Sequence, residues 1–438
     1  MQQSNVLATL VRGASTALVI QILSAGVLYG TQVLLARWLG TTAYGIYDYV
    51  NAVGVSLAFL AGLGLPVAVL RFTSEYVTRQ DWARLRGIIW GSWQQTLVVS
   101  LITSICGTAI VLQLQASGHL SAYTTPLTVG IWAVPIVALL NLQTEIVRAF
   151  QQITLAYAPA LILHPLLLIA MAFVWQLRQT MTSTAAIALT MISALLTLVL
   201  QWVLFQKNLD PKIRSARPVY AVAYWSKIAL PLLLVSGSHI ILSQTDTLMI
   251  GTLINAKAVG IYSAALKTSL WVPFILIAVN AISAPLIASL YAQGDRPGLQ
   301  QLVSTVARWM FYPAFAIAVV LISFSKPILQ LFGTEFAAAK VALIILILGQ
   351  LVNVGVGSVA YLMMMTGHQN QSALVMGVSA LTNVILNLIG IHFLGIIGAA
   401  LATALSMTMW NVWLHALVVR ELGVRPSILA TFQLPHLQ

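Results

Sequence analysis

The chain has 438 residues, of which 60% are hydrophobic and 7% are charged, and its mean hydropathy is +0.94. A soluble globular protein carries about 25% charged residues, so this composition excludes an ordinary soluble protein and predicts a polytopic membrane protein. The net charge of +12 would suggest a nucleic-acid partner in a soluble protein. Here the basic residues lie mainly in short loops without a basic–aromatic module, so we expect no nucleic acid and attribute the charge to orientation in the membrane.

A membrane-spanning helix needs about 20 mostly apolar residues. An open strand edge cannot be satisfied in lipid, so the fold is predicted to be all-α. The chain contains twelve runs of the required kind: Ala14–Leu35, Tyr49–Leu70, Ile88–Leu114, Pro126–Ile146, Leu155–Leu177, Ser183–Phe205, Ile228–Ile250, Val259–Ser289, Val303–Phe324, Val341–Met365, Ser372–Phe393 and Gly395–Val418.

The basic residues indicate the orientation of these twelve segments. With the N-terminus in the cytoplasm, fifteen Lys and Arg residues fall on the inside and five on the outside, while Lys267 stays within a span. This excess follows the rule that cytoplasmic loops are enriched in Lys and Arg. We therefore expect a multi-pass protein with both termini in the cytoplasm.

A weak internal repeat relates the two halves of the chain. Gly45-Ile46-Tyr47 recurs as Gly260-Ile261-Tyr262 at an offset of 215, and Asp81 recurs as Asp295 at an offset of 214. Six spans separate the copies, so both halves insert with the same orientation and form two parallel six-helix lobes. The predicted lobes are residues 1–206 and 228–438, joined by a cytoplasmic linker, 207–227, with a short interfacial helix at 219–225.

An ordered series of motifs runs through most of the chain. It comprises Arg37-Trp38-Leu39-Gly40 and Gly45-Ile46-Tyr47, Asp246-Thr247-Leu248-Met249-Ile250-Gly251, Val259-Gly260-Ile261-Tyr262, Phe332-Gly333-Thr334-Glu335-Phe336, Thr366-Gly367-His368-Gln369, and Gly395-Ile396-Ile397-Gly398-Ala399-Ala400. This series resembles the polysaccharide-transport (O-antigen flippase-like) family of the multidrug/oligosaccharidyl-lipid/polysaccharide (MOP) exporter superfamily.

The resemblance implies a V-shaped bundle like that of MATE (multidrug and toxic compound extrusion) transporters, working by alternating access. It also implies a cargo, an undecaprenyl-pyrophosphate-linked oligosaccharide moved from the inner to the outer leaflet for cell-surface polysaccharide or lipopolysaccharide biosynthesis. The expected location is a bacterial or archaeal cytoplasmic membrane. The resemblance further implies no cofactor apart from H⁺ or Na⁺ coupling, a monomer surrounded by membrane lipids, and a polysaccharide polymerase or chain-length machinery as candidate partner.

Lys267 is the leading candidate for contact with the cargo. It lies eight residues into the run Val259–Ser289, a depth of about 12 Å in a helix. Placing an ammonium there costs at least about 2.5 kcal/mol on insertion scales, which favours a wet cavity and an anionic ligand such as pyrophosphate. The alternatives are snorkelling towards the interface and pairing with a structural carboxylate.

Other candidate substrate-binding residues are weaker. Arg148 follows Glu145 at a spacing of three, so the two side chains could neutralise each other on one helix face. Arg12 and Lys227 begin spans at the inner surface, where they serve orientation or guide the pyrophosphate. Amide side chains within the spans could bind sugar hydroxyls or join neighbouring helices: Gln21, Gln32, Asn51, Gln143 and Asn383.

Three residues are candidates for ion coupling. Asp246 follows Ser243-Gln244-Thr245 near the outer end of its span, and this polar run predicts an inward-facing surface. Asp246 could bind a proton or Na⁺, pair with Lys267, or stabilise a hairpin. Asp48 is a second candidate of the same kind. His239 lies near mid-span and could relay protons, although a packed histidine is the more common role.

The chain contains no HExxH motif, Cys–His metal spacing, Walker loop or nucleophile elbow, so we expect a transporter and not an enzyme. A multidrug exporter of the same fold remains an alternative. Its cationic cargo would require buried carboxylates and aromatic walls instead of a deep lysine. A membrane polymerase or glycosyltransferase would require long extracytoplasmic loops, and the loops here are short.

Overall fold

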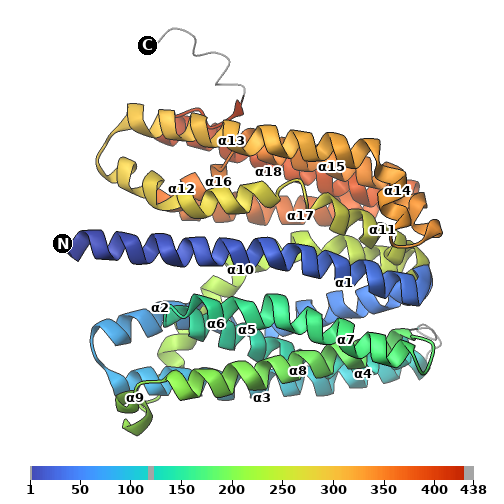
Figure 1. Ribbon diagram of the computed structural model, residues 1–438, viewed down its shortest axis with the longest axis horizontal. Coiled ribbons are helices and arrows are strands. Elements are labelled where there is room, and N and C mark those ends of the chain that lie inside the picture. Colours follow the sequence, from blue (N-terminus) through green and yellow to red (C-terminus); the bar gives the residue numbers. More distant parts are fainter. Residues whose placement is uncertain (1, 117–122, 429–438) are drawn as a thin grey trace. The chain divides into compact units, whose positions relative to one another are not determined.

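A computed structural model describes residues 2–116 and 123–428. Within these ranges the chain is helical and contains no strand. Contacts between residues divide the protein into two compact units, Met1–Ile240 and Ile241–Gln438. Each unit is a bundle of long helices joined mostly by short turns (Figure 1).

The first unit holds ten helical elements and the start of an eleventh: α1 (Gln2–Ala61), α2 (Leu65–Thr78), α3 (Trp82–Ala116), α4 (Thr124–Ile131), α5 (Val134–Ala149), α6 (Ile153–Ala158), the π-helix η1 (Pro159–Leu163), α7 (His164–Gln176), α8 (Ser183–Asn208), α9 (Pro211–Ser215) and α10 (Val222–Leu253). Its largest core cluster joins α2, α3, α5 and α8 with the first turns of α10.

The second unit begins within α10 and continues through α11 (Ala256–Ser269), α12 (Phe274–Ala292), α13 (Arg296–Ser323), α14 (Ser325–Gln330), the 3₁₀-helix η2 (Thr334–Ala339), α15 (Lys340–Val356), α16 (Val359–Met365), α17 (Gln369–Leu394) and α18 (Ile396–Leu422). A core cluster in this unit includes residues of α12, α13, α16, α17 and α18.

The internal repeat has a structural counterpart at the start of the third long helix of each unit. Asp81 accepts a hydrogen bond from the backbone N–H of Arg84 before α3, and Asp295 caps α13 through Gly298. Such caps satisfy backbone N–H groups that lack a partner within the helix. The repeat noticed in the sequence therefore marks the same local structure twice.

The segment that leaves the last long helix of each unit folds back onto this same region. Arg86 in α3 donates to the carbonyl of Ala216 at 2.7 Å, beyond α8. Gln300 in α13, at the offset of 214 from Arg86, donates to the carbonyl of Arg425 at 3.1 Å and accepts from its N–H at 2.7 Å, beyond α18. In each unit, a side chain at the same repeat position therefore forms a hydrogen bond with the backbone of the segment that follows the last long helix.

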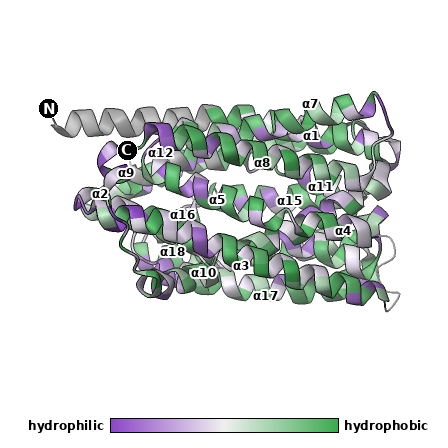
Figure 2. Cartoon of the chain, turned by 90° about the horizontal axis from the view of Figure 1, so that it is seen from below, coloured by the Kyte–Doolittle hydropathy of each residue, from purple (hydrophilic) through white to green (hydrophobic). Residues whose placement is uncertain are grey.

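Nine helical segments of the described residues are long and apolar enough to cross a membrane, or ten if the bent α10 is one span. Figure 2 shows hydrophobic residues along the middles of the long helices and hydrophilic residues gathered near α2 and α9. These numbers are below the predicted twelve partly because some predicted runs share one helix in the structure and others are divided between two helices. The first run and most of the second belong to α1, which changes direction at Gly40, a residue with φ of 71°. The second run ends in α2, beyond a break at residues 62–64.

Three other predicted runs are interrupted. The run Pro126–Ile146 is divided into α4 and α5, Val259–Ser289 into α11 and α12, and Val341–Met365 into α15 and α16. Pro135, Pro273 and Gly357 lie at or next to these breaks. Proline cannot continue the backbone hydrogen bonding of a helix interior, and the φ of 86° at Gly357 suits glycine alone.

The predicted linker at 207–227 also differs from the structure. Its short helix is α9, Pro211–Ser215, whereas Val222 to Trp225 form the first turn of α10. Trp225 is buried and donates a hydrogen bond to the hydroxyl of Tyr76 at 3.1 Å. This packing joins the start of α10 to the first unit and explains why the division between units falls later than predicted.

Candidate functional site

A buried polar cluster in the second unit centres on Asp246 of α10, whose exposed fraction is 3%. Thr403 of α18 donates to its Oδ2 at 2.6 Å, and Asn387 of α17 donates to its Oδ1 at 2.9 Å. Tyr262 of α11 also donates its phenolic proton to Oδ2. Three helices, α11, α17 and α18, therefore each place one hydrogen-bond donor at the carboxylate carried by α10.

The hairpin of α17 and α18 positions two of these partners. Gly395 connects the helices with φ of 58°, and the helices approach so closely that a Cβ on Gly398 would lie 1.8 Å from the carbonyl oxygen of Gly390. Small residues permit such close contact between membrane helices. Asn387 lies about one turn before Gly390, and Thr403 lies just over one turn after Gly398, so both meet Asp246 from this seam.

The hydrogen-bonded cluster continues from the carboxylate to further polar residues of α17 and α18. Asn387 also donates to the backbone carbonyl of Asn383 at 3.1 Å and to its side-chain Oδ1 at 3.2 Å. Asn383 in turn donates to Ser406 at 3.0 Å. The Oδ1 atom of Asn387 is buried and accepts no hydrogen bond, so one oxygen ligand of the cluster is not used by the protein.

The charge of Asp246 has no basic counterpart, since none of its hydrogen-bond or ion-pair partners among the described residues is a Lys, Arg or His. Burial of an unpaired carboxylate is costly, so such a group takes up a proton or a cation. The oxygens of Asp246, Asn383, Asn387 and Thr403 are hard donors of the kind that small alkali cations bind. The buried carboxylate itself could instead take up a proton.

A cavity of about 550 Å³ lies beyond the cluster at the ends of α10 and α17. Its lining includes Leu388, Ile391 and His392 of α17, together with Leu253 at the end of α10 and Ile254 just after it. Leu388 directly follows Asn387 in the chain. The cavity and the polar cluster therefore share this turn of α17.

The predicted substrate ligand Lys267 lies in the last turn of α11 and is half-buried. The helix ends at Ser269, so Lys267 is close to a helix terminus and not in the middle of a continuous span. A cation in the last turn is favoured by the helix dipole. The suggested pairing of Asp246 with Lys267 is wrong, because the partners of Asp246 are Tyr262, Asn387 and Thr403.

Arg148 has the local pairing that its spacing predicts. Its Nη1 lies 3.2 Å from Glu145 Oε1 on the same helix, α5, and 3.3 Å from the hydroxyl of Tyr157. Gln143, also on α5, is fully buried and accepts a hydrogen bond from the indole N–H of Trp93 in α3 at 2.9 Å. Gln143 therefore joins two helices within the first unit, the more common role of a buried amide.

The remaining predicted residues lie in α1 and α10. Asp48 and Asn51 in α1 are half-buried, whereas Lys227 and His239 in α10 are exposed. Arg12 precedes Ile20 in α1. The side chains of this first part of α1 lie outside the described residues.

Sequence reasoning identified Asp246 but missed three of the groups around it. Tyr262, Asn387 and Thr403 do not differ in type from many other polar residues in the spans. Two signals were available: Tyr262 belongs to the repeated Gly-Ile-Tyr motif, and Asn383 and Asn387 are four residues apart, which places them on one helix face.

Comparison with known proteins shows the family of this chain. Residues 10–291 match the family model described as polysaccharide biosynthesis protein, and residues 231–389 match the MatE model. A relative in Haloferax volcanii, the probable low-salt glycan biosynthesis flippase Agl15, is 28% identical over 213 residues, covering 47% of this chain and 42% of the relative. The chain spans less than half of the length of the curated relatives it matches.

Solved structures show the same fold at low sequence identity. An inward-facing multidrug resistance MATE transporter of the MOP superfamily has a TM-score of 0.74 and 15% identity, covering 96% of this chain and 99% of that chain. The lipid II flippase MurJ has a TM-score of 0.73 and 14% identity, covering 96% and 92%. The chain therefore belongs to the polysaccharide biosynthesis protein family, whose model matches residues 10–291.

Proposed function

We propose that the chain is a flippase that moves an undecaprenyl-pyrophosphate-linked oligosaccharide from the inner to the outer leaflet of a cytoplasmic membrane by alternating access. The observation that carries this proposal is the family match over residues 10–291. The relative described as a probable glycan biosynthesis flippase adds support. A polysaccharide polymerase or chain-length machinery would consume the product on the outer side.

The Asp246 cluster is the proposed site of energy coupling. Its carboxylate lacks a basic partner, and the buried Oδ1 of Asn387 has no donor. Binding of H⁺ or Na⁺ would neutralise the carboxylate and change which of Tyr262, Asn387 and Thr403 it holds. Because these residues lie on separate helices, a cation can alter the packing of α10, α11, α17 and α18 together.

Lys267 is the proposed contact for the pyrophosphate. An ammonium offers three hydrogen-bond donors as a point charge, which suits a phosphate oxygen. Lys267 precedes the break between α11 and α12, and Leu270 to Pro273 interrupt the helix there. Arg148 is a weaker candidate because Glu145 already neutralises it.

A reconstituted assay tests the proposal. Proteoliposomes would carry a fluorescent undecaprenyl-pyrophosphate oligosaccharide, and an added glycosidase would report the fraction of sugar exposed outside. We expect the protein to increase exposure, and a Na⁺ or H⁺ gradient to accelerate it. Exposure at the rate of protein-free liposomes, with folded protein present, would refute the flippase assignment.

A multidrug exporter is the second candidate, because the MATE transporter and the MurJ structure match this chain equally well by TM-score, 0.74 and 0.73. The same proteoliposomes distinguish the two functions. A drug exporter would move a cationic dye such as ethidium against its gradient and would leave the sugar lipid in place.

A further inference from the structure

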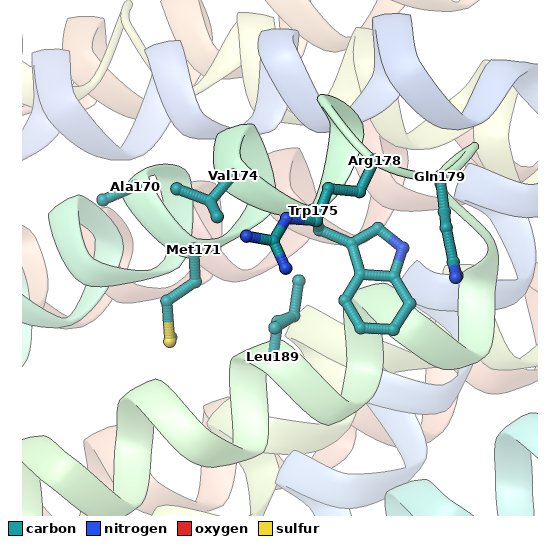
Figure 3. Close-up of a pocket in the computed structure, with 7 residues that line it drawn as sticks. All are labelled: Ala170, Met171, Val174, Trp175, Arg178, Gln179 and Leu189. Carbon is teal, nitrogen blue, oxygen red and sulfur yellow. The ribbon is translucent and has the colours of Figure 1, made fainter.

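A second cavity, of about 560 Å³, lies in the first unit where α7 ends and α8 begins. Its walls are Met171, Val174 and Trp175 of α7 and Leu189 of α8, and its polar residues are Arg178 and Gln179 in the connecting turn (Figure 3). The volume is within the range of about 300–1,000 Å³ that is usual for small-ligand sites. The cavity is therefore large enough for part of a lipid.

Arg178 points into this apolar cavity. Figure 3 shows its guanidinium turned back along α7, between Val174, Trp175 and Leu189. Arg178 is exposed, so its charge is accessible at the end of the helix while its stem lies along apolar side chains. The side chain of Arg178 makes no hydrogen bond or ion pair with any residue in the part of the chain that the structure describes.

The turn that carries Arg178 is held in place on both sides. The side chain of Gln176 accepts the N–H of Met181 at 3.1 Å, and Thr182 caps α8 by accepting the N–H of Ala185 at 3.2 Å. The backbone N–H of Arg178 is bonded to the carbonyl of Trp175 at 3.0 Å. The end of α7 and the start of α8 therefore present the guanidinium from a fixed backbone.

The surface around the cavity is apolar and exposed. Phe173 is 54% exposed, Val174 55% and Leu177 70%, which is expected of side chains that face acyl chains. Tryptophan is enriched at the depth of the lipid headgroups, and Trp175 contributes one wall. We therefore expect the cavity to open towards lipid near the headgroups.

We propose that this cavity binds an anionic phospholipid, whose phosphate pairs with Arg178 and whose acyl chain lies along Met171, Val174 and Leu189. A guanidinium binds phosphate through two parallel hydrogen bonds, and the amide of Gln179 is placed beside it. None of the described residues that line the cavity is a carboxylate that could pair with the quaternary ammonium of phosphatidylcholine. The site therefore prefers phosphatidylglycerol to phosphatidylcholine.

Native mass spectrometry of the purified protein tests this preference. Phosphatidylglycerol and phosphatidylcholine are titrated separately against the unmodified protein, Arg178→Gln and Lys326→Gln. Lys326 is an exposed cation of α14 in the other unit, so its loss matches the change in net charge. We expect Arg178→Gln alone to weaken phosphatidylglycerol binding about tenfold. Equal effects of the two variants, or equal binding of the two lipids, would overturn the proposal.

Fluorescence of the unmodified protein provides an independent measurement. Phosphatidylglycerol with brominated acyl chains should quench Trp175, and Trp175→Phe should remove that part of the quenching. Brominated phosphatidylcholine at the same concentration should quench less. No difference between the protein and Trp175→Phe would exclude a lipid chain in this cavity, whether or not Arg178→Gln folds.

Discussion

Replacement of Asp246 by asparagine removes the proposed coupling charge with little change in shape. Three hydrogen bonds reach the carboxylate, from Tyr262, Asn387 and Thr403. A hydrogen bond to a charged group contributes about 1.5–3 kcal/mol and one to a neutral group about 0.5–1.5 kcal/mol. The variant therefore loses about 3 kcal/mol across the three contacts if the carboxylate is ionised.

This loss is offset because the variant no longer buries an unpaired charge, which costs several kcal/mol. Without a coupling cation we therefore expect the two proteins to have similar stability. With Na⁺ or H⁺ at 100 times its dissociation constant, the unmodified protein should gain about 2.7 kcal/mol. Asp246→Asn should gain nothing.

Thermal unfolding of the purified protein measures this difference. Na⁺ is titrated against choline at constant ionic strength, and pH is varied separately. Asp295→Asn is the control, because asparagine can also cap α13 and the cation response should persist. A full Na⁺ or pH response in Asp246→Asn would refute the assignment, and loss of the response in Asp48→Asn instead would move the site to α1.

Three further predictions follow from the contacts described. Thr403→Val removes a donor at 2.6 Å from the carboxylate and should weaken cation binding about tenfold in the same titration, an effect of ~1.4 kcal/mol, whereas Thr403→Ser should bind normally. Lys267→Ala should leave the lipid-linked oligosaccharide accumulated on the inner leaflet and Lys267→Arg should restore part of the export, so normal export by the alanine variant would remove this residue from the site. A Cβ on Gly87 would lie 1.9 Å from the carbonyl oxygen of Val219, so Gly87→Ala should lower the unfolding temperature, whereas Gly30→Ala, with no atom within 4 Å, should raise it or leave it unchanged.

Much of the fold could be predicted from composition and repetition. Long apolar runs in a chain with few charges leave helices as the only structure that satisfies the backbone in lipid. The offset of 214 related Asp81 to Asp295, and both are helix caps in the structure. Charge and hydropathy are calculated over a stretch of sequence, so they can be used for prediction without knowing how the helices pack.

The interruptions of the helices were harder to predict. Gly40 and Gly357 have positive φ, but many other glycines of the chain lie in regular helix, so residue type alone does not mark a break. Pro313 lies inside the continuous α13, whereas Pro273 directly precedes α12. The difference depends on how neighbouring helices replace the missing hydrogen bond, which a single sequence does not contain.

The candidate site could be predicted only in part, for a related reason. Asp246 was identifiable because an acid in an apolar span is rare. Its partners Tyr262, Asn387 and Thr403 come from three other helices, and their convergence depends on the close contact of Gly390 with Gly398. Lys267 was a candidate because it lies deep in an apolar run that was predicted to be one continuous helix. In the structure α11 ends at Ser269, so Lys267 lies near a helix end.

One helix, α10, has its two ends fastened to different partners. Near its start, Trp225 bonds to Tyr76 and the backbone of Ala229 packs against Gly64, and near its end Asp246 is held by α11, α17 and α18. Pro231 lies inside the helix between these anchors. The same helix thus carries the proposed coupling residue and the contacts of the first unit, so a change at Asp246 would reach α10 through the backbone itself.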